Sequence, residues 1–192
     1  MQKITPEEFI VTDWAGGKTE EIAIFPKGKI YGDRDFDFRI SSATVEGEES
    51  KFTALPDYNR FLAVLTGEVR LLNETAKEKF KLTPYKIYAF DGGDSIISHG
   101  QCRDFNLMVK KDSCCGSMTT TRLSREAQVL SFKSNETVLI FCGEGKITLE
   151  MEGDKLPLLA LESAIIKGGN EIIVSSQEDA WVILCRMWQK VS

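Results

Sequence analysis

The sequence contains a single histidine, His99, among 192 residues. Metal centres that activate oxygen usually combine several imidazole ligands with a carboxylate. One histidine cannot supply such a set, so metal-dependent oxygenases and isomerases are strongly disfavoured. We therefore expect no metal and no other cofactor.

Other features of common protein classes are missing too. The chain has no run of about 18 apolar residues that could span a membrane and no apolar N-terminal segment of a secretory signal. Its net charge of −5 and scattered Lys and Arg residues argue against nucleic-acid binding. The five cysteines are irregularly spaced, as expected of reduced thiols. We expect a soluble cytoplasmic protein that binds neither nucleic acids nor membranes.

Catalytic motifs are equally scarce. The chain has no Gly-x-Ser-x-Gly nucleophile elbow and no cysteine in a histidine-bearing context. Gly16-Gly17-Lys18-Thr19 resembles the end of a phosphate loop but lacks the earlier glycine. His99 acting as a general base with Asp104 stays open as a minor alternative.

Short β runs separated by Gly, Asn, Asp and Pro clusters make up most of the chain, which is typical of a sandwich or barrel. The one helical start is at Thr5-Pro6-Glu7-Glu8, where Thr5 and Glu8 fit a capping box. The predicted strands are residues 21–25, 36–45, 61–65, 69–72, 86–90, 105–110, 127–131, 137–141, 146–151, 163–166, 171–174 and 181–188.

Two turn signals recur at one offset. Gly67 and Gly143 follow similar apolar runs, and Gly92 and Gly168 begin similar Gly-Gly turns, in both cases 76 positions apart. A strand, a glycine turn, a strand and a Gly-Gly turn are typical of cupin-type barrels. The sequence therefore predicts an all-β fold of two tandem barrels, with domains at 1–112 and 113–192 packed as one compact bicupin.

We use the 76-residue offset to align the two copies position by position. It places Asp104 opposite Ala180, Asn106 opposite Val182, and Arg60 opposite Glu136. Because a strand alternates its faces, Asp104 and Asn106 share one face. This predicts a polar lining in the first barrel and an apolar second barrel.

Arg39 and Ser41 share a strand face by the same alternation. An inward guanidinium is suited to binding a carboxylate, and a serine hydroxyl adds a neutral hydrogen bond. A structural interpretation stays open for Arg39, because any buried guanidinium needs a partner. For Arg60 the sequence alone slightly favours an exposed loop charge.

At these residues the chain resembles the HutD/Ves family. The resemblance rests on five segments in order: WAGGKTEEI (14–22), FRISSATV (38–45), LPDYNR (55–60) after Phe52, FDG (90–92) and DFNLM (104–108). It implies a double cupin-like barrel of the RmlC type, made of two tandem jelly-roll units, and a link to histidine utilisation. Family site residues carry over to Thr19, Arg39, Ser41, Arg60, Asp104 and Asn106. The chain departs from the family pattern at 95–101, which looks short, and at 57–59.

We expect a non-catalytic protein that binds a small anionic metabolite in the first barrel and modulates histidine catabolism. The resemblance suggests urocanate, formate or a glutamate derivative as the ligand. A metal-independent cupin enzyme, an isomerase or hydrolase acting on a small acid, is the alternative. A third class is an interaction module whose apolar second barrel forms a homodimer.

Overall fold

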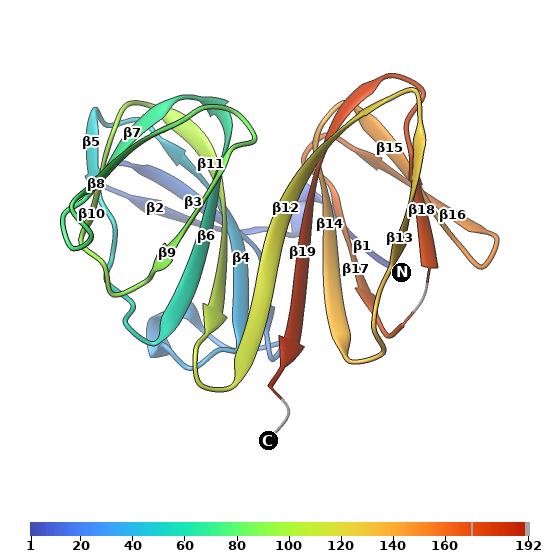
Figure 1. Ribbon diagram of the computed structural model, residues 1–192, viewed down its shortest axis with the longest axis horizontal. Coiled ribbons are helices and arrows are strands. Elements are labelled where there is room, and N and C mark those ends of the chain that lie inside the picture. The colour runs from blue at the N-terminus through green and yellow to red at the C-terminus, as the bar shows by residue number, and fades with distance from the viewer. Residues whose placement is uncertain (170, 191–192) are drawn as a thin grey trace. The chain divides into compact units, whose positions relative to one another are not determined.

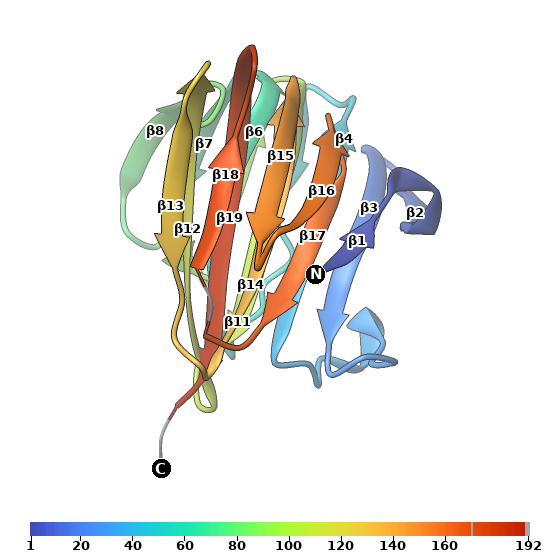
Figure 2. The same cartoon turned by 90° about the vertical axis from the view of Figure 1, so that its right-hand side faces the viewer.

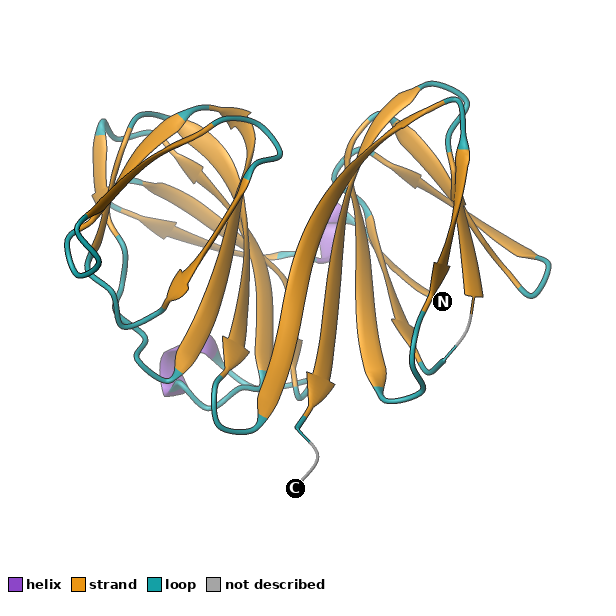
Figure 3. Ribbon diagram, in the orientation of Figure 1, coloured by secondary structure: helices purple, strands orange, loops and turns teal. Residues whose placement is uncertain are grey.

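The computed structural model describes residues 1–169 and 171–190. Its described residues form nineteen strands and two short 3-10 helices, so the all-β prediction is confirmed (Figure 3). They contain no helix long and apolar enough to cross a membrane. The predicted capping box at the start of the chain forms the 3-10 helix η1 (Pro6–Glu8), where the Thr5 amide donates to the Glu8 carboxylate at 2.8 Å.

The chain divides into two compact units. One comprises Phe9–Cys115, and the other comprises Gly116–Ser192 together with Met1–Glu8. The N-terminal strand β1 (Gln2–Ile4) joins the second unit by pairing antiparallel with β17 (Ser163–Lys167). This division shows where contacts concentrate along the chain, and the domains at 1–112 and 113–192 stay a prediction.

The unit Phe9–Cys115 consists of two sheets whose apolar faces pack together (Figure 1). The six-stranded sheet has, in spatial order, β2 (Ile10–Trp14), β3 (Gly17–Phe25), β4 (Phe38–Val45), β11 (Cys102–Lys110), β6 (Tyr58–Gly67) and β9 (Ile87–Asp91). The four-stranded sheet has β5 (Glu49–Lys51), β10 (Ile96–His99), β7 (Val69–Asn73) and β8 (Glu78–Leu82). Their shared core includes Leu62, Val64, Leu71 and Ile96.

The second unit repeats this plan (Figure 2). Its five-stranded sheet has, in spatial order, β1, β17, β14 (Glu136–Glu144), β19 (Asp179–Gln189) and β12 (Cys114–Ser124). Its four-stranded sheet has β13 (Ala127–Ser131), β18 (Glu171–Ser175), β15 (Lys146–Met151) and β16 (Asp154–Leu159). The order β4-β11-β6-β9 in the first unit corresponds to β12-β19-β14-β17 in the second, so the predicted tandem repeat is confirmed.

The repeat offset, however, is not constant. Gly67 and Gly145 both have φ of 79°, and each lies against the backbone where the unit's last long strand begins, at Gln101 beside β11 and at Asp179 in β19. A bulge follows in both units, between Arg103 and Asp104 in one and beside Val182 in the other. These equivalences give an offset of 78 on β6, β7 and β11, while β9 and β17 keep 76.

Two connections that differ in length cause these changes of offset. The turn between β7 and β8 has four residues, 74–77, whereas Glu152 and Gly153 alone connect β15 to β16. Two-residue hairpins need positive φ at their central positions, and Glu152 and Gly153 have φ of 54° and 89°. The connection from β18 to β19 is in turn two residues longer than that from β10 to β11, with six residues between Ser175 and Val182 but four between His99 and Asp104, and this restores 78. The pairing from the constant offset was wrong: Asp104 corresponds to Val182, Asn106 to Leu184, and Arg60 to Val138.

Candidate functional site

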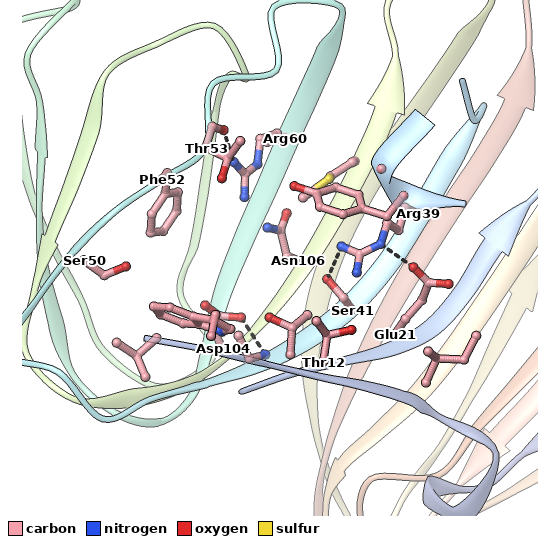
Figure 4. Close-up of a pocket in the computed structure, with 18 of the residues that line it drawn as sticks. Thr12, Glu21, Arg39, Ser41, Ser50, Phe52, Thr53, Arg60, Asp104 and Asn106 are labelled. Atoms are coloured by element: carbon pink, nitrogen blue, oxygen red, sulfur yellow. Dashed lines mark hydrogen bonds and ion pairs between the residues drawn. The ribbon is translucent and has the colours of Figure 1, made fainter. Parts of the chain in front are cut away.

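A cavity of about 700 Å³ opens on the inner face of the six-stranded sheet. All six residues predicted from the sequence line it: Thr19, Arg39, Ser41, Arg60, Asp104 and Asn106. The close-up in Figure 4 shows five of them, Arg39, Ser41, Arg60, Asp104 and Asn106, converging on one space from neighbouring strands. The structure thus brings the predicted set together, and a ligand-binding role for it stays a proposal.

Strand register explains the convergence. Met108 on β11 pairs with Arg39 on β4 and with Arg60 on β6, so the two arginines flank the same residue. One step along the same face, Asn106 pairs with Ser41. Because alternate residues of a strand share a face, one sheet surface presents all of these side chains to the cavity.

Arg39 already has a carboxylate partner. Its Nε donates to Glu21 Oε2 at 2.6 Å, and its Nη1 donates to Ser41 Oγ at 3.2 Å. The Arg39 and Glu21 side chains are only 7% and 11% exposed, so the pair is held out of water. In this structure Arg39 therefore has its partners within the protein, as the structural interpretation holds, and Glu21 neutralises its charge.

Tyr31 is packed between two guanidinium groups above the sheet. It starts the 3-10 helix η2 (Tyr31–Asp33), and the guanidinium carbons of Arg34 and Arg39 each lie 4.1 Å from its ring centroid. Such cation–π contacts hold both the ring and the cations in place. Tyr31 lines the cavity, so η2 contributes a fixed aromatic wall.

Arg60 differs from Arg39 in having no ion-pair partner among the described residues. Its Nη1 donates to the Thr53 carbonyl at 3.3 Å, while its Nε is buried without a hydrogen bond. The guanidinium lies 5.1 Å from the Phe52 ring and 5.2 Å from the Phe90 ring. Burial lowers the Arg60 pKa to about 10, so the group stays charged at neutral pH. The site therefore holds a buried cation without a counter-charge in contact.

Asp104 is the acidic residue of the cavity whose charge favours the charged form of Arg60. Its Oδ1 accepts the Ala43 amide at 3.1 Å, and it is only 7% exposed. Burial raises its pKa to about 7, against the opposing effects of the Ala43 hydrogen bond and the Arg60 and Arg103 charges. Asp104 is thus close to half protonated at neutral pH, and it offsets the Arg60 charge only in part.

Several lining residues escaped the sequence analysis. Glu21 follows Thr19 by two positions on β3, so strand alternation could have revealed it. Tyr31, Phe52 and Thr53 come from irregular segments that carry no periodic signal. Trp14 also lines the cavity and is 38% exposed.

His99 lies apart from this set. It is on β10, its side chain is 48% exposed, and its Nδ1 is 3.5 Å from Glu49. It is not among the residues that line the cavity. Within the described part of the chain, no three His, Cys, Asp or Glu side chains are grouped as a metal site would require.

The equivalent positions of the second unit are apolar. Val138, Val182 and Leu184 replace Arg60, Asp104 and Asn106; the two valines lie in that unit's hydrophobic core, and Leu184, partly buried, packs against it. The predicted contrast between the copies therefore holds, although with different residue pairs. Within a shared architecture, only the first unit has buried polar groups at these positions.

Comparisons with known proteins agree with this fold. An uncharacterised 21.2 kDa protein from the hutC 3′ region of Pseudomonas putida is 26% identical over 180 residues, 89% of this chain and 88% of that protein. HutD from Pseudomonas fluorescens SBW25, solved in a formate condition, superposes with a TM-score of 0.81 at 23% identity, covering 99% of both chains. A cupin 2 conserved barrel domain protein from Leptotrichia buccalis has a TM-score of 0.61 at 13% identity, covering 98% of this chain and 96% of that one.

The fold is therefore cupin-like, in two copies. The model of the HutD family matches residues 7–184, which is most of the chain. The chain belongs to the HutD family, which is associated with histidine utilisation.

Proposed function

We propose that the protein is a non-catalytic, cytoplasmic binding protein whose first unit holds a small carboxylate, and that this binding modulates histidine catabolism. One observation carries the proposal: Arg60 is a buried guanidinium that faces a cavity and has no ion-pair partner among the residues that the structure describes. A buried charge is costly unless it is paired, so a carboxylate ligand would supply the missing counter-charge.

Local chemistry supports a carboxylate over other anions. A guanidinium presents a planar fork of N–H donors that matches the two oxygens of a carboxylate. Phe52 and Phe90 stack near the Arg60 guanidinium and leave its edge as the hydrogen-bonding direction. Thr19, Ser41 and Asn106 would orient the remainder of the ligand.

A thermal-shift panel of small carboxylates tests the proposal. Urocanate, formate and glutamate derivatives come first, because of the family's association with histidine utilisation. A ligand that binds only the folded protein raises its melting temperature. At a ligand concentration one hundred times Kd, binding adds about 2.7 kcal/mol to the free energy of unfolding.

Two variants make the result specific. Arg60→Met should abolish the ligand-induced shift, and the exposed Arg70→Met in the same unit should preserve it. A panel in which no carboxylate stabilises the wild type would refute the proposal.

Catalysis by Asp104 is a second candidate function, favoured by one observation. A cavity carboxyl whose pKa is raised to about 7 by burial is suited to exchanging protons near neutral pH. NMR monitoring of each stabilising acid, with wild type and with Asp104→Asn, tests it. Conversion by the wild type alone would favour a metal-independent enzyme, and an unchanged acid would favour the binder.

A further inference from the structure

Strand β13 forms one edge of the four-stranded sheet in the second unit. It pairs antiparallel with β18 and with no other strand that the structure describes, and Figure 2 shows it at the border of its sheet. The free side of an edge strand presents backbone N–H and C=O groups that have no partner in the sheet. β13 can therefore accept one more strand.

The sequence of β13, AQVLS, contains neither a charged residue nor a proline. Charged side chains and prolines on edge strands keep natural sheets from pairing with other chains. Each of the other edge strands has at least one such residue: Lys3 in β1, Asp13 in β2, Lys51 in β5, Lys79 in β8, Asp91 in β9, Arg122 in β12 and Pro157 in β16. Among the sheet edges that the structure describes, β13 alone lacks this protection.

The outer face beside this edge is apolar. Val129 is 62% exposed, and it pairs across the ladder with Ile173, which is 39% exposed. Two positions away on the same face, Ala127 pairs with Ser175, so no charge separates the apolar pair from this part of the edge. Cross-strand apolar pairs stabilise a sheet, and a strand added at β13 would extend this pair into a row.

The charges at the two ends of β13 indicate which strand fits. Arg125 lies two residues before the strand, and Glu171 lies beside its last residue, where the Ser131 hydroxyl donates to Glu171 Oε1 at 3.2 Å. Extended chain from residue 125 to residue 131 covers roughly 20 Å, so the two exposed charges are far apart within one chain. An antiparallel copy of the same strand reverses the ends and brings opposite charges together.

We propose that two copies of this protein associate through β13, antiparallel and about a two-fold axis, so that their four-stranded sheets join into one. Pairing centred on Gln128 places Arg125 of each copy opposite Ser131 of the other, and therefore close to its Glu171. Such an interface uses the same strand of both copies and ends at a dimer. A five-residue strand covers less area than a standard interface, so we expect a weak dimer with a Kd on the order of 10–100 µM.

Sedimentation equilibrium of the full chain from about 1 µM to about 1 mM tests the proposal. The mean mass of the wild type should rise from that of one chain toward that of two and no further. Val129→Lys puts an ammonium group on each copy at positions roughly 7–8 Å apart across the junction, and it should weaken the dimer at least about tenfold. Leu159→Lys is the matched control: Leu159 is 53% exposed on β16, the opposite edge of the same sheet, and its variant should dimerise like the wild type.

A charge exchange tests the antiparallel arrangement. Arg125→Glu and Glu171→Arg should each weaken the dimer about threefold, because each places like charges beside one another at both ends of the junction. The double variant Arg125→Glu/Glu171→Arg should recover the wild-type affinity to within about twofold, since attraction is restored with its signs reversed. Recovery requires contact between copies, because the two positions lie at opposite ends of β13 within one chain.

Hydrogen exchange gives a readout that needs no variant. Amide protection of residues 127–131 should rise with protein concentration, while that of residues 154–159 in β16 should stay constant. A protein that stays monomeric throughout the range would overturn the inference and leave this edge to an extended peptide of another protein. A dimer that Val129→Lys leaves intact, or that adds no protection at 127–131, would also overturn it. None of these outcomes bears on ligand binding in the first unit, so the proposed function is tested separately.

Discussion

Arg39 and Arg60 face the same cavity from the two strands that flank β11, yet of the two only Arg39 forms an ion pair within the described chain. Both arginine residues are 6% exposed, so the difference lies in their partners rather than in their depth. Arg39 is therefore already committed to Glu21, and Arg60 is available to a ligand.

This difference predicts opposite stability effects. Arg39→Met should destabilise the protein by about 2–4 kcal/mol, because Glu21 is left as a buried unpaired carboxylate. Arg60→Met should leave stability unchanged or raise it, because it removes a buried cation that has no counter-ion. Chemical denaturation of each variant provides the measurement.

The double variant Glu21→Gln/Arg39→Met is the control for this pair. It removes both charges and should recover most of the stability that Arg39→Met loses. Equal losses for Arg39→Met and Arg60→Met would contradict the assignment of different partners.

Asp104 should make the protein less stable as the pH rises. Burial raises its pKa from 3.8 to about 7, so across this window the folded protein keeps a proton that the unfolded chain releases. Stability is therefore lost between about pH 4 and pH 7. Asp104→Asn keeps the acceptor for the Ala43 amide and cannot lose a proton, so its stability should not fall between pH 4 and pH 7. The pH-dependent loss in the free energy of unfolding that it avoids is up to about 4 kcal/mol at pH 8. Melting curves from pH 4 to pH 8 measure it, and parallel curves for both proteins would count against the raised pKa.

Ligand binding should depend on the same proton. A carboxylate at Arg60 brings a negative charge toward Asp104, so it binds best when Asp104 is protonated. The other charges facing Asp104 are Arg60 and Arg103, which stay positive throughout this range. Affinity should therefore fall above pH 7, by at most about tenfold per pH unit for one linked proton. Calorimetry at pH 6, 7 and 8 should show this slope in the wild type and none in Asp104→Asn.

Placing the residue of one unit at the equivalent position of the other should affect stability differently in the two directions. Val182→Asp places an unpaired carboxyl in a hydrophobic core and should cost at least about 3 kcal/mol. Asp104→Val removes a desolvated carboxyl from a position where the second unit already has valine, and it should be tolerated. Thermal unfolding of both variants at pH 8 tests the comparison, and a tolerated Val182→Asp would show that the units are not equivalent there.

Strand periodicity was enough to predict much of the fold. Every predicted run overlaps a strand, and 127–131 and 146–151 coincide with β13 and β15. The strands that were missed include β1, β2 and β5, which are short or lie at sheet edges. Such strands bury few side chains, so they lack the apolar alternation that marks a strand.

The site was predictable where it lies on regular strands. Asp104 and Asn106 alternate on β11, as Arg39 and Ser41 do on β4, and the structure places all four at one cavity. The correct counterparts in the second unit were not predictable, because the β15–β16 hairpin is two residues shorter than its counterpart and the β18–β19 connection is two residues longer, so no single offset holds. The Glu21 partner of Arg39 was also missed, since it depends on pairing between β3 and β4.

The pairing of β1 with β17 has a consequence for dissecting the molecule. The unit that contains Gly116–Ser192 draws a strand from the opposite end of the chain, so Phe9–Cys115 is an insertion within it. A fragment cut at residue 116 would lose β1 and expose the outer edge of β17, and unpaired edges promote aggregation. A variant that keeps residues 1–8 and replaces 9–115 by a flexible linker is therefore the appropriate form in which to isolate this unit, and the linker must cross the sheet because β1 and β12 lie at its opposite edges.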